Sequence, residues 1–261
     1  MLKRSVLSAW SWFALVVIII VWFPMVTLTW LVTAPFDKGR YAAGYLFRKL
    51  TVAHQLLTPM WKFHTSGELP KDKRRPYVVV ANHESFVDIL LISHLPIEMK
   101  WLSKETIFKF PLVGWMMRMA GDVSVVRGDR TSGAAALKAC RDRLDKRVSV
   151  MIFPEGTRSA DGSLGQFKDG AFRLAIESGA PILPLVVHGT RTALRKHDWR
   201  LGDSRAEVRV LSPVSTEGLT EADVADLRER VRTMIADELA VMAAAMDVAR
   251  GSGHLPNQRP E

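Results

Sequence analysis

The residues best suited to chemistry are a histidine and an aspartate five positions apart, in the segment Asn-His-Glu-Ser-Phe-Val-Asp that begins at Asn82. This segment follows an apolar run over residues 77–81, which is typical of a buried strand in an α/β protein, and active sites often follow such strands. A neutral imidazole can take a hydroxyl proton through one ring nitrogen while a carboxylate holds the other N–H. We therefore expect His83 to be a general base oriented by Asp88; the plainer alternative is a capping histidine and a surface aspartate.

A second candidate segment, Phe-Pro-Glu-Gly-Thr-Arg-Ser from Phe153, follows an apolar run over residues 148–153. Gly156 permits a tight turn and a close approach of the backbone to a ligand. Arg158 carries a planar fork of donors that can bind a phosphate group in two places. The alternative for this segment is an ordinary β-turn with an exposed arginine.

Together the two segments resemble the 1-acylglycerol-3-phosphate O-acyltransferase family, whose NHxxxxD and FPEGTRS motifs are matched in full and in order, about 70 residues apart. Two weaker blocks also match, over residues 104–127 and 180–184. Asp122 stands in the first of these where the family usually has an apolar residue, and Ala180 stands in the second where valine is usual. The resemblance covers roughly residues 77–190.

The resemblance implies transfer of a fatty acyl group from an acyl thioester, acyl-ACP or acyl-CoA, to the sn-2 hydroxyl of 1-acyl-sn-glycerol-3-phosphate, giving phosphatidic acid. No cofactor and no metal are expected. His83 and Asp88 would be catalytic. The residues expected at the acceptor, with cations to offset the charge of a phosphate monoester, are Glu155, Gly156, Thr157, Arg158, Arg127 and Lys104. Lys168 is a looser candidate, for which a solvated charge is the more common role.

Other functions stay open at this point. The acceptor could be another lysolipid, such as a lyso-ornithine lipid or lysophosphatidylcholine. The same His–Asp pair could serve a membrane-bound esterase or thioesterase acting on water, although no G-x-S-x-G segment is present. A lipid-binding protein without activity is a further alternative, which the complete motifs disfavour. The single cysteine, Cys140, lies outside every block and is expected to be a packed small side chain.

Composition and the N-terminal sequence both indicate a membrane surface. Lys plus Arg total 36 against 27 Asp plus Glu, a net charge of +9, which favours anionic partners. No nucleic-acid-binding motif is found, so the expected partners are the lysophospholipid, the acyl donor and the membrane. Residues 5–36 contain no charged side chain. As a helix they would be roughly 48 Å long, enough for one tilted span or a re-entrant hairpin.

Residues 40–64 are expected to form either an interfacial amphipathic helix or a helix packed on the domain. The expected location is the cell (inner) membrane with the active site facing the cytoplasm. The alternation of apolar runs predicts an α/β fold, a layered mixed sheet flanked by helices, of the glycerolipid acyltransferase type, with an N-terminal membrane helix segment. The division would be a membrane anchor and interfacial helix over 1–66, an acyltransferase domain over 67–250 and a disordered tail over 251–261.

The local patterns predict individual elements within that fold. Glu84 begins a predicted helix over residues 84–95 that Asn82 would cap, and Thr131 or Ser132 would cap the next helix over 134–147. The remaining predictions are strands over 77–81, 122–126, 148–153, 182–188 and 206–211, a helix over 169–178, and a long helix from 224 after a capping box over 220–223.

Overall fold

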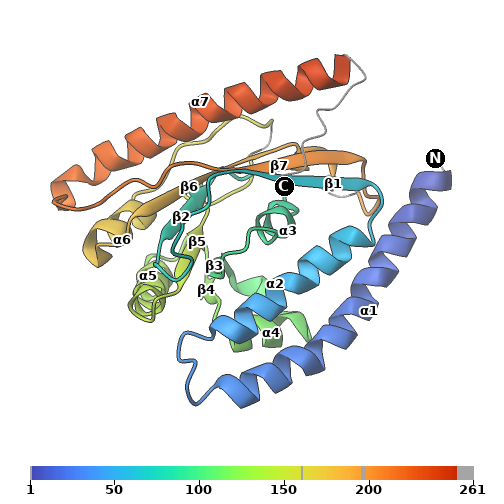
Figure 1. The fold of residues 1–261 in the computed structure, drawn as a ribbon, viewed down its shortest axis with the longest axis horizontal. Helices are drawn as coiled ribbons and strands as arrows, with labels where there is room; N and C mark the ends of the chain where they lie inside the picture. The colour runs from blue at the N-terminus through green and yellow to red at the C-terminus, as the bar shows by residue number, and fades with distance from the viewer. Residues whose placement is uncertain (1, 160, 195–197, 252–261) are drawn as a thin grey trace.

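Seven strands form one sheet in the order β1-β7-β6-β2-β5-β3-β4 in the computed structural model, which describes residues 2–159, 161–194 and 198–251 (Figure 1). All neighbouring pairs are parallel except β6 with β7. The mixed sheet expected from the sequence is therefore confirmed. The strands are β1 Trp61–Gly67, β2 Val78–Ala81, β3 Met99–Lys104, β4 Val123–Val125, β5 Ser149–Ile152, β6 Ile182–His188 and β7 Ser204–Val210.

Helices cover both faces of this sheet (Figure 1). One face packs on α5 Arg130–Asp145, α6 Gly170–Ser178 and α7 Val224–Gly251, and the other on α3 Asp88–Ile92. Beyond α3 lie α1 Leu2–Thr33, α2 Tyr41–Leu56 and α4 Val113–Ala120. Val78 and Val80 of β2 pack into the core under α5, α6 and α7, whereas Val79 packs into the core under α3. The central strand is therefore buried on both faces, as its uninterrupted apolar run requires.

Most predicted strands are found within two residues of their expected bounds, but the helix predicted over residues 84–95 is wrong. Only Asp88–Ile92 is helical, and residues 82–87 form an irregular loop. Asn82 does not cap that helix; its amide side chain instead bonds both the N–H and the C=O of Val187, at 2.8 Å each. The cap of α5 is Asp129, whose carboxylate accepts two backbone N–H groups, so the expected Thr131 or Ser132 cap is also wrong.

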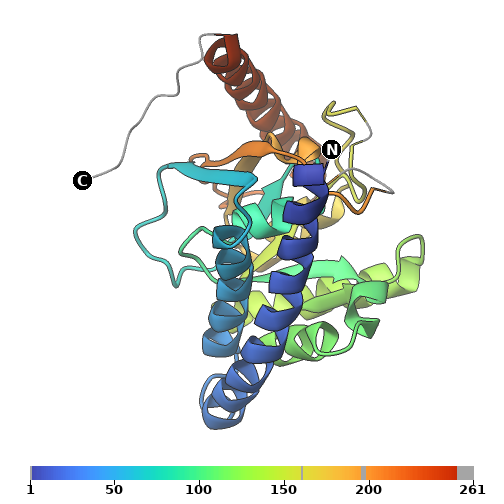
Figure 2. The same ribbon diagram turned by 90° about the vertical axis from the view of Figure 1, so that its right-hand side faces the viewer.

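The N-terminal segment forms a helical pair packed against the domain (Figure 2). α1 continues through Pro24 and is the one helix among the described residues that is long and apolar enough to cross a membrane. Indole N–H groups at two levels of α1, Trp10 and Trp22, donate to the backbone of Leu57 and Leu46. Arg4 bonds the carbonyl of Leu201 at 2.8 Å, so the helix is fastened to the rest of the chain along its length.

α2 packs between α1 and the domain, as the second of the two alternatives for residues 40–64 proposes. The helix ends at Leu56, however, and Trp61 begins β1, so helix through residue 64 is wrong. β1 pairs with β7 and crosses the expected boundary at residue 66. At the other end of the chain α7 runs to Gly251, and the rest of the expected tail lies outside the described residues.

Candidate active site

The candidate residues lie at one edge of the sheet because five strands end there side by side. β2, β5, β3, β4 and β6 are mutually parallel along the sheet. His83 follows β2, Phe153 follows β5, Lys104 is the last residue of β3, and Arg127 comes two residues after β4. The carboxyl edge of parallel strands is the usual place for a site in such sheets. The topology therefore brings together segments that are about 70 residues apart in the chain.

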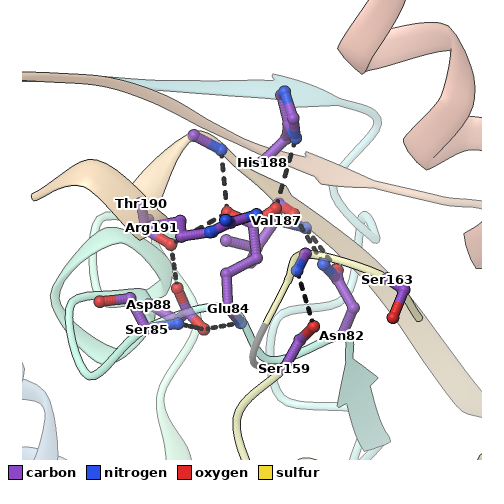
Figure 3. A network of polar contacts seen from close by, with 12 residues as sticks. Asn82, Glu84, Ser85, Asp88, Ser159, Ser163, Val187, His188, Thr190 and Arg191 are labelled. Atoms are coloured by element: carbon purple, nitrogen blue, oxygen red, sulfur yellow. Dashed lines mark hydrogen bonds and ion pairs between the residues drawn. The ribbon is translucent and has the colours of Figure 1, made fainter. Parts of the chain in front are cut away.

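His83 and Asp88 meet as the sequence predicts. The Nδ1 atom of His83 lies 2.7 Å from Oδ2 of Asp88, and both side chains are buried. The same oxygen accepts the backbone N–H groups of Glu84 (2.8 Å) and Ser85 (3.0 Å; Figure 3). Because the carboxylate can only accept, Nδ1 carries the hydrogen and Nε2 of the neutral ring is the acceptor. No described residue forms a hydrogen bond to Nε2, which leaves it for a proton of another molecule.

Thr190 is a further hydrogen-bond partner of the Asp88 carboxylate, and the sequence analysis did not predict it. Its hydroxyl donates to Oδ1 of Asp88, the oxygen that His83 does not use (Figure 3). Thr190 is fully buried in a single 3₁₀ turn that begins two residues after the end of β6. Glu84 ties the same turn to the first segment by accepting the N–H of Gly189 at 3.1 Å. The one signal in the sequence was its place two residues after an apolar strand, at the edge where His83 also lies.

Glu155 joins the second segment to the first. Its Oε1 accepts the backbone N–H of His83 at 2.8 Å, and its Oε2 accepts that of Gly165 at 3.0 Å. Ser159 in turn donates its N–H to the carbonyl of His83 at 2.8 Å. The ring of Phe153 stacks on the His83 imidazole with centroids 3.9 Å apart. The segment thus fixes both the backbone and the ring of His83, and burial raises the pKa of the Glu155 carboxyl.

Four cations surround this edge with their charges free. The side chains of Lys104, Arg127, Arg158 and Lys168 are exposed and have no hydrogen-bond or ion-pair partner within the described part of the chain. Gly156 has φ of +71°, and a Cβ there would lie 2.8 Å from Nζ of Lys168. Lys168, the looser candidate, therefore lies directly against the turn that carries Arg158. Thr157 is exposed in the same turn.

An apolar cavity of about 180 Å³ lies beside the pair, between the sheet and the N-terminal helices. Trp101 in its wall packs on Phe153 with centroids 6.1 Å apart, and Phe153 stacks on His83. The cavity is therefore one aromatic ring removed from the candidate base. Its apolar walls come from α1, α2, α3 and β3 and include Leu15, Ile19, Leu50, Val87, Leu90 and Trp101.

Cys140 lies apart from this edge, buried in the core under α5. Burial raises the pKa of its thiol to about 12, so it is held in the unreactive protonated form. Among the described residues, no group of three or more His, Cys, Asp or Glu side chains is arranged to hold a metal ion.

In a comparison with known proteins, residues 61–188 match the family model described as Acyltransferase. The chain is 39% identical over 178 residues to a chloroplastic 1-acyl-sn-glycerol-3-phosphate acyltransferase of Arabidopsis thaliana, covering 67% of this chain and 48% of that one. It is 34% identical over 229 residues to a 1-acyl-sn-glycerol-3-phosphate acyltransferase of Chlamydomonas reinhardtii, covering 84% and 68%. The chain thus spans about half the length of the plant relatives it matches.

A solved structure is similar over nearly the whole chain. The crystal structure of the 1-acyl-sn-glycerophosphate (LPA) acyltransferase PlsC from Thermotoga maritima superposes with a TM-score of 0.79 at 26% identity. The match covers 93% of this chain and 97% of that one, so it includes the N-terminal helices as well as the sheet.

Proposed function

The chain belongs to the acyltransferase family that includes the 1-acyl-sn-glycerol-3-phosphate acyltransferases, and from this premise we propose that it makes phosphatidic acid. The reaction is transfer of a fatty acyl group from an acyl thioester to the sn-2 hydroxyl of 1-acyl-sn-glycerol-3-phosphate. The observation that carries the proposal is the His83–Asp88 pair. Its carboxylate is fixed by three N–H or O–H donors besides the imidazole, and it lies at an edge ringed by free cations.

The chemistry follows from the free Nε2 of His83. Nε2 takes the proton of the acceptor hydroxyl as the oxygen attacks the thioester carbonyl, and Asp88 stabilises the imidazolium. The tetrahedral intermediate collapses with loss of the C–S bond. The imidazolium then returns the proton to the departing thiolate, so that a new ester and a free thiol leave. No covalent enzyme intermediate is required, which agrees with the inert, buried Cys140.

The acceptor's phosphate is proposed to bind the exposed cations. Arg158 offers a bidentate fork, Lys104 is the last residue of β3, and Arg127 lies two residues after the neighbouring strand β4. Glu155 and Gly156 shape the turn that presents Thr157 and Arg158. Lys168, which lies against Gly156, is available to the same phosphate.

The donor's acyl chain is proposed to occupy the apolar cavity. This would explain why an apolar space is separated from His83 only by the ring of Phe153. Acyl-ACP and acyl-CoA both remain as donors in this proposal. The carriers share an acidic, phosphorylated character, so the net charge of +9 suits either one.

The outer side of α1 is proposed to enter the bilayer. Val6, Phe13, Ile20 and Leu28 are each 58–63% exposed, a continuous apolar surface that water disfavours. Because the inner side of α1 is bonded to the domain, we propose that the helix lies in the membrane with the domain attached along it, in place of a free span. The proposed location is the cell (inner) membrane, with the active site facing the cytoplasm.

Purified full-length protein in detergent–lipid micelles tests the proposal. Labelled acyl-CoA and acyl-ACP are supplied with 1-acyl-sn-glycerol-3-phosphate, lysophosphatidylcholine or a lyso-ornithine lipid, and esters and free fatty acid are both measured. Phosphatidic acid is expected as the main product. Predominant free fatty acid would make the chain an esterase or thioesterase, and preference for another lysolipid would change the acceptor.

A pair of histidine variants locates the chemistry. His83→Ala is expected to abolish transfer while thermal unfolding stays cooperative. His64→Ala, a matched change at an exposed position on β1 away from the site, is expected to keep wild-type turnover. Wild-type turnover by His83→Ala would refute the proposed role of His83 as the general base.

A further inference from the structure

A second pair of histidine and carboxylate lies beside the catalytic one, at the end of β6. Nδ1 of His188, the last residue of β6, lies 3.3 Å from Oε1 of Glu84, which directly follows His83 in the chain (Figure 3). The Glu84 side chain is 5% exposed and that of His188 is 23% exposed, so an imidazole near the surface reaches a carboxylate that is almost removed from water. Because the ionised carboxylate can only accept, Nδ1 of His188 carries the hydrogen.

The turn after β6 supplies the donors that a buried carboxylate needs. Besides the imidazole of His188, the N–H of Gly189 donates to Oε2 of Glu84 at 3.1 Å. Burying a charged group without such partners is strongly unfavourable, so the placement of Glu84 depends on this turn. Gly189 has φ of +93°, and a Cβ there would lie 2.2 Å from the carbonyl oxygen of Arg205, so the turn is packed closely against β7.

The hydroxyl of Thr190 lies between the two carboxylates. It donates to Oδ1 of Asp88, while its oxygen lies 3.4 Å from Oε2 of Glu84. Hydrogen bonds between a hydroxyl and an oxygen are usually about 2.5–3.0 Å long, so the single hydroxyl proton belongs to Asp88. A hydroxyl has one proton to donate, and the carboxylate that receives it is the one less well supplied with other donors.

Glu84 also contacts Asp88 directly, so it acts on both oxygens of that carboxylate. Its backbone N–H donates to Oδ2 of Asp88 at 2.8 Å, and its side chain holds the turn whose hydroxyl reaches Oδ1. Asn82, two residues earlier, bonds both the N–H and the C=O of Val187. Side chains from positions 82, 84 and 88 thus bond successive residues at the end of β6, which fixes the two segments relative to each other (Figure 3).

We propose that His188 and Glu84 are positioning residues for the catalytic pair, on which they act through the hydroxyl of Thr190; this rests on the function proposed above. By donating to Glu84, His188 leaves the hydroxyl proton to Asp88. Without the imidazole, Oε1 of Glu84 loses its one donor among the described residues, and the carboxylate competes for the proton of Thr190. Asp88 then keeps three donors at Oδ2 but shares the one at Oδ1, so it holds the imidazole of His83 less firmly.

A double-mutant cycle tests this inference, with initial rates of phosphatidic acid formation by the full-length protein measured over a range of acceptor concentrations. His188→Phe keeps an aromatic ring but removes the donor. kcat should fall about 5- to 20-fold, less than in Thr190→Val, because the hydroxyl is shared and not removed. The acceptor KM should stay within about threefold, since the effect passes through Asp88 and not through the phosphate. His188→Asn, whose amide N–H can take the place of Nδ1, should recover most of kcat.

The other half of the cycle removes the competing charge. Glu84→Gln keeps an oxygen for the N–H of Gly189 but has no charge with which to compete for the proton of Thr190. In that background His188→Phe should change kcat by less than about twofold. The matched control His64→Phe, at an exposed position on β1, should have no effect in either background. Equal losses of kcat from His188→Phe in both backgrounds, or a folded His188→Phe protein with wild-type kcat, would overturn the inference.

A second cycle does not depend on any change at His188. Glu84→Ala removes the carboxylate that holds the turn after β6, and kcat should fall about tenfold. Added to Thr190→Val, the same change should lower kcat by less than about twofold further, because both act through one hydroxyl.

Thermal unfolding of every variant separates loss of folded protein from loss of kcat. Fully additive losses in the Glu84–Thr190 cycle would show that Glu84 acts by another route and would overturn the inference. Absence of acyl transfer by the wild type would instead reject the proposed function, and the inference with it.

Discussion

Removing the hydroxyl of Thr190 isolates the contribution of the Asp88 shell to catalysis. Thr190→Val replaces the hydroxyl with a methyl group of similar shape, so the buried turn keeps its packing. Oδ1 of Asp88 then loses its one hydrogen bond among the described residues, while Oδ2 keeps three. A hydrogen bond to a charged group contributes about 1.5–3 kcal/mol. If that energy holds the carboxylate in its orienting position, kcat should fall about 10- to 150-fold.

The assay separates positioning from stability. Initial rates of phosphatidic acid formation are measured over a range of acceptor concentrations, and the folded fraction is checked by thermal unfolding. kcat should fall while the acceptor KM stays within about threefold, because Thr190 is expected to act through Asp88 and His83 and not on the phosphate. Thr190→Ser keeps the hydroxyl and should recover most of kcat. The matched control Thr192→Val, at an exposed position two residues on, should keep wild-type rates.

The reasoning would be refuted by a folded Thr190→Val protein with wild-type kcat. It would also be refuted if serine and valine lowered kcat equally, because the hydroxyl would then be irrelevant. A lower melting temperature with unchanged kcat would assign the hydrogen bond to stability alone.

Three further outcomes are expected. Arg158→Ala should raise the acceptor KM by about 10- to 100-fold with little change in kcat, as for loss of a charged hydrogen bond in binding; an unchanged acceptor KM would remove it from the phosphate site. Native enzyme should keep its activity in N-ethylmaleimide at about pH 8, because the buried Cys140 thiol has its pKa raised to about 12; rapid inactivation prevented by Cys140→Ala would contradict this. Burial raises the pKa of Glu155 in the folded protein, so at a pH above this raised pKa the ionised carboxylate lowers the free energy of unfolding. This destabilisation decreases as the pH falls and is gone once the pH is below the pKa of the same carboxyl in the unfolded chain. Urea unfolding should therefore show the wild type gaining stability over Glu155→Gln as pH falls from about 7 to about 4, and a constant difference would argue against it.

The sequence located the reactive segments because each is a polar stretch directly after an apolar strand. It did not give the path of the backbone between His83 and Asp88. Apolar spacing over residues 84–95 favoured a helix, but the N–H groups of Glu84 and Ser85 bond the Asp88 side chain instead. A short acidic side chain that competes for backbone donors in this way holds the chain in a loop. The irregular loop thus follows from the same carboxylate that orients the histidine.

Thr190 shows a different limit, set by distance along the chain. It bonds Asp88 across 102 residues, and only the adjacency of β6 and β2 brings the two together. Apolar periodicity identifies each strand, but it does not tell which strands become neighbours. A site residue that lies within a sequence motif can therefore be predicted from the sequence. A site residue such as Thr190, which only the order of the strands brings to the site, can be recognised only in the structure.

Asp122 is another residue whose partner lies far away in the sequence. Its structure explains why a carboxylate stands where the family usually has an apolar residue. Seen alone, a carboxylate at an apolar position weakens the resemblance. In the structure it is neutralised by Arg48, 74 residues earlier on α2, and it also accepts the N–H of Trp101. Removing one member of a buried ion pair costs about 3–5 kcal/mol, whereas replacing both is often neutral, so the two positions are constrained to change together. Because Arg48 lies on a helix that packs against α1, the helical pair that we propose to lie in the membrane also supplies one wall of the cavity proposed for the acyl chain.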